Sequence, residues 1–212
     1  MNVVVTGGTG YIGRPLIGAL IGRGHAVRCV LRPGSERRLP AAAAGIPANV
    51  LDAASFRDRI APAETLVHLV GTPRPNPAKA RQFREIDLRS VEAALDAALH
   101  AGVRHFVYLS VAQPAPVMRA YVEVRQAGEA MIRASGLAAT FVRPWYVLGP
   151  GHRWPYVLLP AYKLLEHVPA TREMALRLGF VTLAQMVHAL VHAVENPPAG
   201  ARVMDVPEIR RF

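Results

Sequence analysis

Residues 3–13 read Val3-Val4-Val5-Thr6-Gly7-Gly8-Thr9-Gly10-Tyr11-Ile12-Gly13, near the start of a chain of 212 residues. The β-branched run at the front is long enough for one buried strand. Glycines follow at a spacing of three residues, and apolar side chains then recur with a helical period at Ile12, Leu16, Ile17 and Leu20. The stretch therefore predicts a strand, a tight turn and a helix.

The spaced glycines suit a turn that binds a dinucleotide. Gly7 permits a tight turn, Gly10 lets a pyrophosphate approach the backbone, and Gly13 lets the helix pack close to the strand. The N–H groups freed at the helix start, together with the helix dipole, form an anion site. An ordinary strand-helix turn is the alternative, but the strand and the helix that the motif requires are both predicted. We expect cofactor contacts from Gly7, Thr9, Gly10, Tyr11, Ile12 and Gly13.

The length and composition indicate a single domain that folds without disulfides or a bound metal. A chain of 212 residues can bury a substantial core. Although 51% of the residues are hydrophobic, no uninterrupted apolar run approaches the roughly 20 residues that span a bilayer. Because the chain begins directly with a strand, we expect no secretory signal and a cytoplasmic location. Cys29 lies in a predicted strand, where a small buried hydrophobe is expected rather than a reactive thiol.

The net charge of +10 raises the question of a nucleic-acid partner. The positive charges are spread singly along the chain, and the densest group, on residues 74–89, lies mostly on one predicted helix and has no aromatic platform for base stacking. Scattered charge of this kind normally forms a solvated surface. We therefore expect no nucleic-acid partner.

The end of the second predicted strand bears on the choice between NADP and NAD. Dinucleotide folds that bind NAD usually carry an acidic residue there, about 20 residues beyond the glycines. This chain has Arg32, followed by Ser35, Arg37 and Arg38. A guanidinium can bind a 2′-phosphate bidentately, and the Ser35 hydroxyl can add a hydrogen bond. We expect NADP(H), with NAD(H) less favoured; a surface loop that is simply basic is the alternative.

The rest of the chain alternates strands and helices, as in a doubly wound parallel sheet. Strands are expected at 26–31, 49–51, 65–70, 103–110 and 139–143, and helices at 12–23, 53–59 and 78–100. The alanine-rich residues 41–48 predict a short or poorly formed helix. We expect one α/β domain with a Rossmann-type core, 1–148, and a small, abbreviated C-terminal lobe with a closing helix and strand, 149–212.

Further candidate cofactor contacts follow the predicted strands. Asp52 could accept a hydrogen bond from an adenine amino group, although a helix N-cap explains it equally well. Gly71 and Thr72 follow the fourth strand, at the edge where ligands bind in open α/β sheets. Pro144 ends the sixth strand and completes this set. His68, inside the fourth strand, is expected to be a core histidine.

Three polar residues form a candidate catalytic group. Ser110 stands at the carboxyl end of the fifth strand. Tyr121 and Arg125 lie four residues apart on the helix that follows, so they project from one helical face.

The chain resembles the atypical and extended short-chain dehydrogenases/reductases, near the NAD-dependent epimerase/dehydratase and NmrA-like NAD(P)-binding groups. The resemblance covers about two thirds of the chain and extends to residues 180–206, similar to the family's late helix and closing strand. The matching phrases are Thr6-Gly7-Gly8-Thr9-Gly10-Tyr11-Ile12-Gly13, Ala101-Gly102-Val103-Arg104-His105-Phe106-Val107-Tyr108-Leu109-Ser110, Ala134-Ser135-Gly136-Leu137 and Phe141-Val142-Arg143-Pro144.

The resemblance implies that Ser110 hydrogen-bonds a substrate oxygen and that Tyr121 transfers the proton. It also implies a lysine four residues after the tyrosine, which holds the ribose and lowers the pKa of the tyrosine. This chain has Arg125 there. A guanidinium stays charged, and so could still favour tyrosinate, but it is wider and cannot pass a proton on.

Two classes of function follow. The first is an NADP-dependent oxidoreductase or epimerase-like enzyme acting on a small, partly apolar substrate. The second is a non-catalytic NADP(H) sensor or accessory subunit, as in atypical members of the family thought to bind the cofactor without turnover. A homodimer is compatible with either class.

The apolar segment 154–169 contains three aromatic residues and several prolines. It is expected to lie over the nicotinamide end of the cofactor and to wall an apolar pocket. Packing as the core of the C-terminal lobe, and docking on a membrane surface or a partner, are the alternatives.

Overall fold

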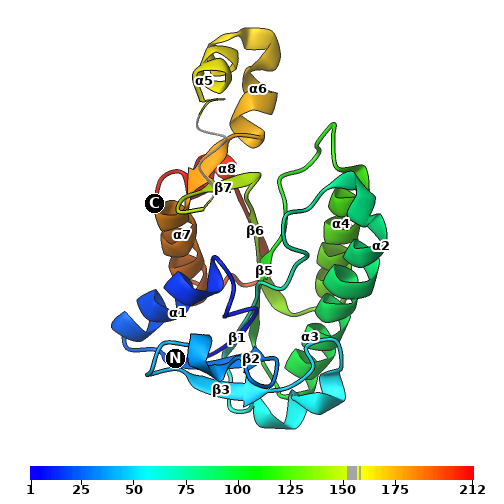
Figure 1. The fold of residues 1–212 in the computed structure, drawn as a ribbon, viewed down its shortest axis with the longest axis vertical. Helices are drawn as coiled ribbons and strands as arrows, with labels where there is room; N and C mark the ends of the chain where they lie inside the picture. The colour runs from blue at the N-terminus through cyan, green and yellow to red at the C-terminus, as the bar shows by residue number, and fades with distance from the viewer. Residues whose placement is uncertain (152–156, 158) are drawn as a thin grey trace.

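The computed structural model describes residues 1–151, 157 and 159–212 and shows a doubly wound α/β fold (Figure 1). A seven-stranded sheet with the order β3-β2-β1-β4-β5-β6-β9 forms its centre, and every neighbouring pair is parallel. The expected fold class is confirmed. The strands are β1 (Asn2–Thr6), β2 (Ala26–Leu31), β3 (Ala44–Pro47), β4 (Thr65–His68), β5 (His105–Leu109), β6 (Ala138–Arg143) and β9 (Ala201–Asp205).

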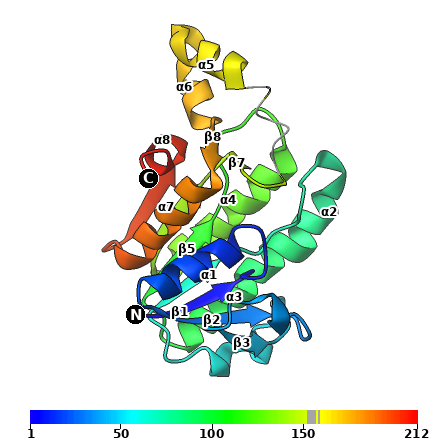
Figure 2. The ribbon, with the colours of Figure 1, turned by 60° about the vertical axis from the view of Figure 1, so that its left-hand side comes forward.

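Helices cover both faces of the sheet, so its central strands are apolar on both sides. One face carries α1 (Gly13–Gly22) and α7 (Leu183–Glu195), which contact each other. The other carries α3 (Arg89–His100) and α4 (Arg119–Ala134) (Figures 1 and 2). Cys29 lies in the core on the first of these faces, and burial raises the pKa of its thiol to about 11. The expectation of a small buried hydrophobe is confirmed.

The third strand differs from the prediction. The structure places it at β3 and not at residues 49–51, because the alanine-rich stretch pairs with β2, with Cys29 opposite Gly45 and Val30 opposite Ile46. Ile46 is buried on the sheet, and this tertiary pairing overrides the local helix propensity of alanine. Residues 49–51 form a turn, which the Asn49 side chain closes by accepting from the Leu51 N–H at 3.1 Å.

Two predicted helices are less regular than expected. The segment at 53–59 consists of two short 3₁₀ turns, Ala53–Ser55 and Arg57–Arg59. The long helix is divided into a 3₁₀ turn (Pro77–Lys79), α2 (Ala80–Gln82), a π-helical stretch (Phe83–Leu88) and α3. π-Helical stretches are often found at functional sites, and this one contains the fully buried Asp87.

The C-terminal third divides between the sheet and a projecting part. A second, two-stranded parallel sheet pairs β7 (Tyr146–Leu148) with β8 (Phe180–Thr182). Between them α5 (Leu159–His167) and α6 (Pro169–Arg177) pack together and project from the body (Figures 1 and 2). The closing helix and strand, expected with the lobe from 149 on, return to the main layers as α7 and β9; the short α8 (Val206–Ile209) follows.

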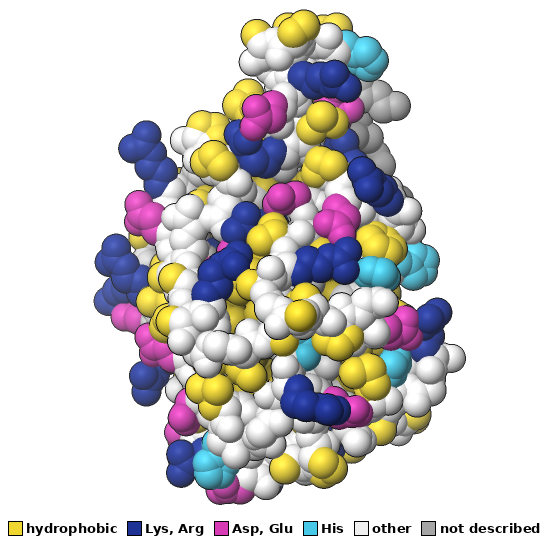
Figure 3. All heavy atoms as spheres, turned by 180° about the vertical axis from the view of Figure 1, so that it is seen from behind, with side chains coloured by type: hydrophobic (Ala, Val, Ile, Leu, Met, Phe, Trp, Pro, Cys, Tyr) yellow, Lys and Arg dark blue, Asp and Glu magenta, His cyan; other side chains and the backbone are white. Residues whose placement is uncertain are grey.

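Two surface features complete the description. Over the described residues, no helix combines the length and the apolar character needed to cross a membrane. Figure 3 shows one face of the molecule, on which Lys and Arg side chains lie scattered among acidic and neutral ones.

Candidate functional site

The glycine turn has the tight geometry that its sequence predicts. Gly7 has a φ of +76°, and a Cβ there would lie 2.9 Å from the Leu69 carbonyl carbon. A Cβ at Gly13 would lie 2.5 Å from the Gly7 oxygen, so α1 begins directly against the turn. At Gly10 the nearest atom to an added Cβ is the Gly7 oxygen, at 3.2 Å, so the outer side of the turn is open to a ligand.

Gly8 is also closely packed in this turn, which the spacing of the other glycines did not predict. A Cβ at Gly8 would lie 2.4 Å from the Cys29 sulfur and 2.6 Å from a methyl carbon of Ile17. The second glycine of Thr6-Gly7-Gly8 is therefore required by the contact among the turn, β2 and α1. The adjacent glycines, Gly7 and Gly8, were the sequence feature that could have indicated this packing.

The basic loop after β2 is exposed. Arg32 follows the strand directly, and no described residue forms a hydrogen bond or ion pair with its guanidinium. Ser35 precedes a 3₁₀ turn, Glu36–Arg38, and its hydroxyl does not cap that turn. Asp52 caps the 3₁₀ turn that follows it, accepting from the Ala54 N–H at 3.1 Å, as the alternative interpretation expected.

Arg125 is buried and paired with Asp87, which in turn binds Thr72. Its Nη2 donates to the Asp87 carboxylate at 2.7 Å, and both side chains are almost completely shielded from solvent. The same carboxylate accepts from the Thr72 N–H at 2.9 Å and from the Thr72 hydroxyl at 2.5 Å. We refer to Thr72, Asp87 and Arg125 as the Arg125 cluster. Asp87 was not among the site residues predicted from the sequence. An acidic residue within an apolar helical pattern was the feature that could have indicated it.

Backbone groups complete the environment of Arg125. Nη1 donates to the Leu109 carbonyl at 3.0 Å and more weakly to the Val70 carbonyl at 3.4 Å, so the side chain ties α4 to the ends of β4 and β5. Gly71 lies so close that a Cβ there would be 2.3 Å from Nη2. Burial opposes the charge, but Tyr121, Tyr108 and Asp87 outweigh it and raise the pKa of Arg125 above its ordinary value. Nε is buried, and no described residue accepts from it.

Ser110 belongs to a second buried group. Its hydroxyl donates to Glu129 at 2.6 Å, and Glu129 also accepts from Gln113 at 2.9 Å and from both Nε and Nη2 of Arg143, at 2.8 and 2.5 Å. The proton of Ser110 is thus directed at a carboxylate. Glu129 was missed from the sequence, although it follows Arg125 by one helical turn, as Arg125 follows Tyr121. Pro144, next to Arg143, is buried, and its carbonyl accepts from the Ala112 N–H at 3.0 Å.

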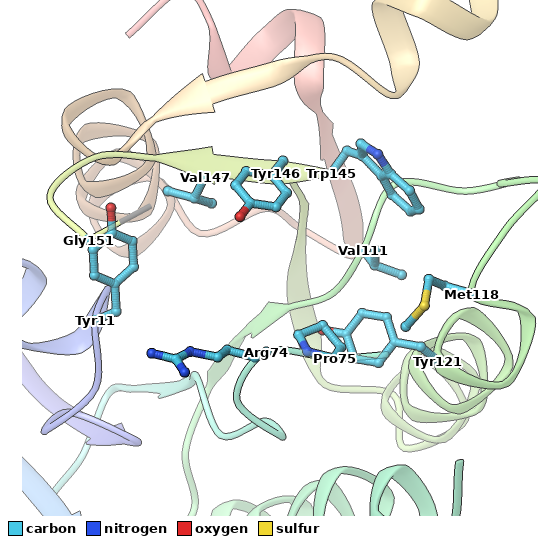
Figure 4. Close-up of a pocket in the computed structure, with 10 residues that line it drawn as sticks. All are labelled: Tyr11, Arg74, Pro75, Val111, Met118, Tyr121, Trp145, Tyr146, Val147 and Gly151. Atoms are coloured by element: carbon cyan, nitrogen blue, oxygen red, sulfur yellow. The ribbon is translucent and has the colours of Figure 1, made fainter. Parts of the chain in front are cut away.

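Tyr121 lies in a pocket of about 660 Å³, which we call the Tyr121 pocket (Figure 4). Its ring meets Phe83 edge-on at 5.0 Å between centroids, and the Arg125 guanidinium carbon lies 5.1 Å from its centroid. The described lining residues are mainly aromatic or apolar: Tyr11, Arg74, Pro75, Val111, Met118, Tyr121, Trp145, Tyr146, Val147 and Gly151. An apolar pocket was predicted from 154–169, but its described walls come from other segments; residues 154–156 and 158 lie outside the described structure.

His68 is a core residue, as predicted. Its Nδ1 lies 2.8 Å from the Thr6 hydroxyl and its Nε2 lies 3.2 Å from the Ser90 hydroxyl, which itself donates to the Asp87 carbonyl at 2.9 Å. This arrangement fits a neutral ring protonated at Nε2. Burial, and secondarily the charge of Arg125, lower the pKa of His68 to about 3.

These features fit a bound dinucleotide. The glycine turn opens at Gly10 and leads into α1, whose first N–H groups can meet a pyrophosphate. The unsatisfied Nε–H of Arg125 is a buried donor that a hydroxyl of the ligand can satisfy. The described residues contain no group of three or more His, Cys, Asp or Glu side chains that could hold a metal ion.

Sequence comparisons agree with this geometry. A family model described as NAD(P)H-binding matches residues 7–167. A ceramide reductase of Caulobacter vibrioides is 30% identical over 99% of this chain and 65% of its own length, so the chain spans just under two thirds of that relative. A 3-diazoavenalumate denitrifying reductase of a Streptomyces species is 30% identical over 94% of this chain and 74% of its own length.

Solved structures show the same fold. A UDP-galactose 4-epimerase superposes with a TM-score of 0.73 at 21% identity, covering 96% of this chain and 76% of that one. A Bordetella bronchiseptica enzyme in complex with NAD⁺ superposes with a TM-score of 0.72 at 20% identity, covering 96% and 75%. The family model, which covers more than half of the chain, shows that it belongs to the NAD(P)H-binding family, and the solved structures show that it shares their fold.

Proposed function

We propose that the protein is an NADP(H)-dependent oxidoreductase that reduces a carbonyl group of a small, partly apolar substrate in the Tyr121 pocket. The observation that carries the proposal is the position of Tyr121 in that pocket, together with Tyr11 from the glycine turn. No described residue forms a hydrogen bond with the Tyr121 hydroxyl, so its proton is available to a substrate. Two relatives at 30% identity are named reductases, which supports this direction of reaction.

The residues of the site take distinct roles in the proposal. When bound, the reduced nicotinamide supplies a hydride to the carbonyl carbon. Tyr121 gives its proton to the carbonyl oxygen. Ser110 polarises the same oxygen once its hydroxyl turns from Glu129 to the substrate. Arg125 cannot pass a proton on; it holds its place under the Tyr121 ring and offers Nε–H to the cofactor.

The preference for NADP(H) rests on the loop after β2. Arg32 is exposed and free of described partners, and Ser35 lies three residues further on. Arg32 can bind the 2′-phosphate, and Ser35 can add a hydrogen bond. Gly7, Thr9, Gly10, Tyr11, Ile12 and Gly13 would hold the pyrophosphate and its neighbours, with Gly71, Thr72 and Pro144 forming the edge beside the nicotinamide half.

NADPH consumption by wild type and Tyr121→Phe tests the proposal. Aromatic and medium-chain aldehydes and ketones are screened as substrates, with the nicotinamide absorbance as readout. For a substrate that wild type turns over, Tyr121→Phe should lower kcat by about 10²- to 10⁴-fold, because general acid catalysis contributes about that much. The affinity for NADPH should stay unchanged.

Tyr162→Phe is a matched control, because Tyr162 lies on α5 and packs against Phe180 outside the described lining of the pocket. It should retain wild-type activity. Full activity of Tyr121→Phe would assign the proton to another group. Tight binding of NADPH without turnover of any compound in the panel would favour the sensor or accessory class instead.

A further inference from the structure

Arg74 occupies a loop conformation that few non-glycine residues adopt. Its φ is +48°, in the left-handed region. Lys79 stabilises the loop, because its Nζ donates to the Pro73 carbonyl at 2.5 Å and to the Arg74 carbonyl at 3.1 Å. Backbone conformations of this kind are found preferentially at ligand sites. The loop thus fixes the point from which the Arg74 side chain extends.

The Arg74 guanidinium faces the Tyr121 pocket and has no partner among the described residues. It is the only cationic side chain among the described lining residues, and no described residue forms a hydrogen bond or ion pair with it. Figure 4 shows it pointing to the side of the pocket on which Tyr11 stands, while Trp145, Tyr146 and Met118 line the remainder. One open cation within apolar walls is suited to an amphipathic anion.

We infer that the substrate carries an anionic group, a carboxylate or a phosphate, which Arg74 binds while its apolar part packs against Trp145 and Tyr146. The planar fork of a guanidinium matches both oxyanions bidentately. This inference rests on the proposed function, and it narrows the substrate from partly apolar to amphipathic and acidic.

The cofactor is the other source of an oxyanion, and the topology argues against it. β1 lies between β2, which leads to Arg32, and β4, which leads to Arg74. The 2′-phosphate is thus assigned to the Arg32 side, and the pyrophosphate has the N–H groups at the start of α1. Of the glycine turn, only Tyr11 is among the described residues that line the pocket of Arg74. Arg74 therefore lies on the substrate side.

A binding experiment tests the inference without requiring turnover. In a Trp154→Phe background Trp145 is the only tryptophan, and its emission reports occupancy of the pocket. The NADPH complex is titrated with hydrocinnamate and with hydrocinnamamide, which share an apolar body and differ in the charge of the head group. The acid should bind about tenfold more tightly than the amide, the preference expected of one charged contact.

Arg74→Gln should abolish this preference, and Arg74→Lys should retain part of it. Arg84→Gln removes an exposed charge from the neighbouring π-helical stretch, outside the described lining, and should leave the preference intact. The inference is overturned if the acid fails to bind, if it binds no better than the amide, or if the preference survives Arg74→Gln. A loss of NADPH affinity in Arg74→Gln would assign Arg74 to the cofactor. Because the experiment measures binding and not turnover, its outcome does not depend on whether Tyr121 is the proton donor.

Discussion

The Arg125 cluster and the Tyr121 pocket share helix α4 and the carboxyl edge of the sheet, but their polar groups are used in opposite ways. In the cluster, Asp87, Thr72 and Arg125 bond to one another away from water. In the pocket, the Tyr121 hydroxyl and the Arg74 guanidinium have no partner among the described residues. The role of each arginine therefore follows from its bonding partners and not from its position at the sheet edge. Changes in the cluster should affect folding, and changes in the pocket should affect ligands.

Asp87→Ala should have the largest effect on stability. It leaves the buried Arg125 charge without its carboxylate, and breaking a buried pair in this way costs about 3–5 kcal/mol. Urea denaturation measures the change in the free energy of unfolding. Arg74→Gln, in the pocket, should change the same quantity by less than about 0.5 kcal/mol.

The double variant Asp87→Leu/Arg125→Met is the control. It removes both charges and leaves apolar side chains, so it should recover most of the loss. A double variant as unstable as Asp87→Ala would show that the ion pair is not the cause.

Gly13→Ala extends the comparison to the glycine turn, which is packed as closely as the cluster. The added Cβ would meet backbone atoms of Gly7 and Gly8 at 2.5–2.8 Å, and backbone cannot move aside cheaply. Overpacking of this kind costs about 1–3 kcal/mol, measured as a lower free energy of unfolding. Gly18→Ala, in the same helix, places its Cβ more than 4 Å from any atom outside the neighbouring helix backbone, and should instead stabilise by about 0.5–1 kcal/mol. Equal effects at the two positions would refute the packing argument.

His68, which connects to the cluster through Ser90 and lies near Arg125, predicts a pH dependence. Its pKa is about 3 in the fold and about 6.5 in an unfolded chain, so unfolding takes up a proton between these values. The contribution to stability is full above about pH 6.5 and is lost as the pH falls, with a slope of about 1.4 kcal/mol per pH unit. His105, whose pKa burial lowers to about 4, acts in the same direction. Urea denaturation of His68→Asn across this pH range should show that unfolding takes up about one proton fewer than in wild type. If the free energy of unfolding depends on pH as steeply as in wild type, His68 is not the group responsible.

Local patterns predicted the fold where local chemistry decides it. The glycine turn and β2 agree with the sequence, because each depends on residues close together in the chain. β3 was misplaced because pairing with β2 overrides alanine's preference for helix. The apolar pattern of the sequence also gives no indication of the π-helical stretch before α3.

The candidate site was predictable only in part. Spacing correctly placed Tyr121 and Arg125 on one helix, and Ser110 directly follows β5. The partners Asp87 and Glu129 lie 38 residues before Arg125 and 19 residues after Ser110, and only the fold brings these groups together. The described walls of the pocket come from several separate segments, which no single apolar stretch could reveal.

Competition between NADPH and NADH, followed by isothermal titration calorimetry, tests the central claim most directly. NADPH should bind at least about tenfold more tightly than NADH, since a charged hydrogen bond to the 2′-phosphate contributes about 1.5–3 kcal/mol. Arg32→Asp should remove this preference, whereas Arg81→Asp, on α2 and paired with Glu85, should keep it. Equal affinities of wild type for the two nucleotides, or a preference that survives Arg32→Asp, would contradict the proposal that Arg32 binds the 2′-phosphate of NADPH.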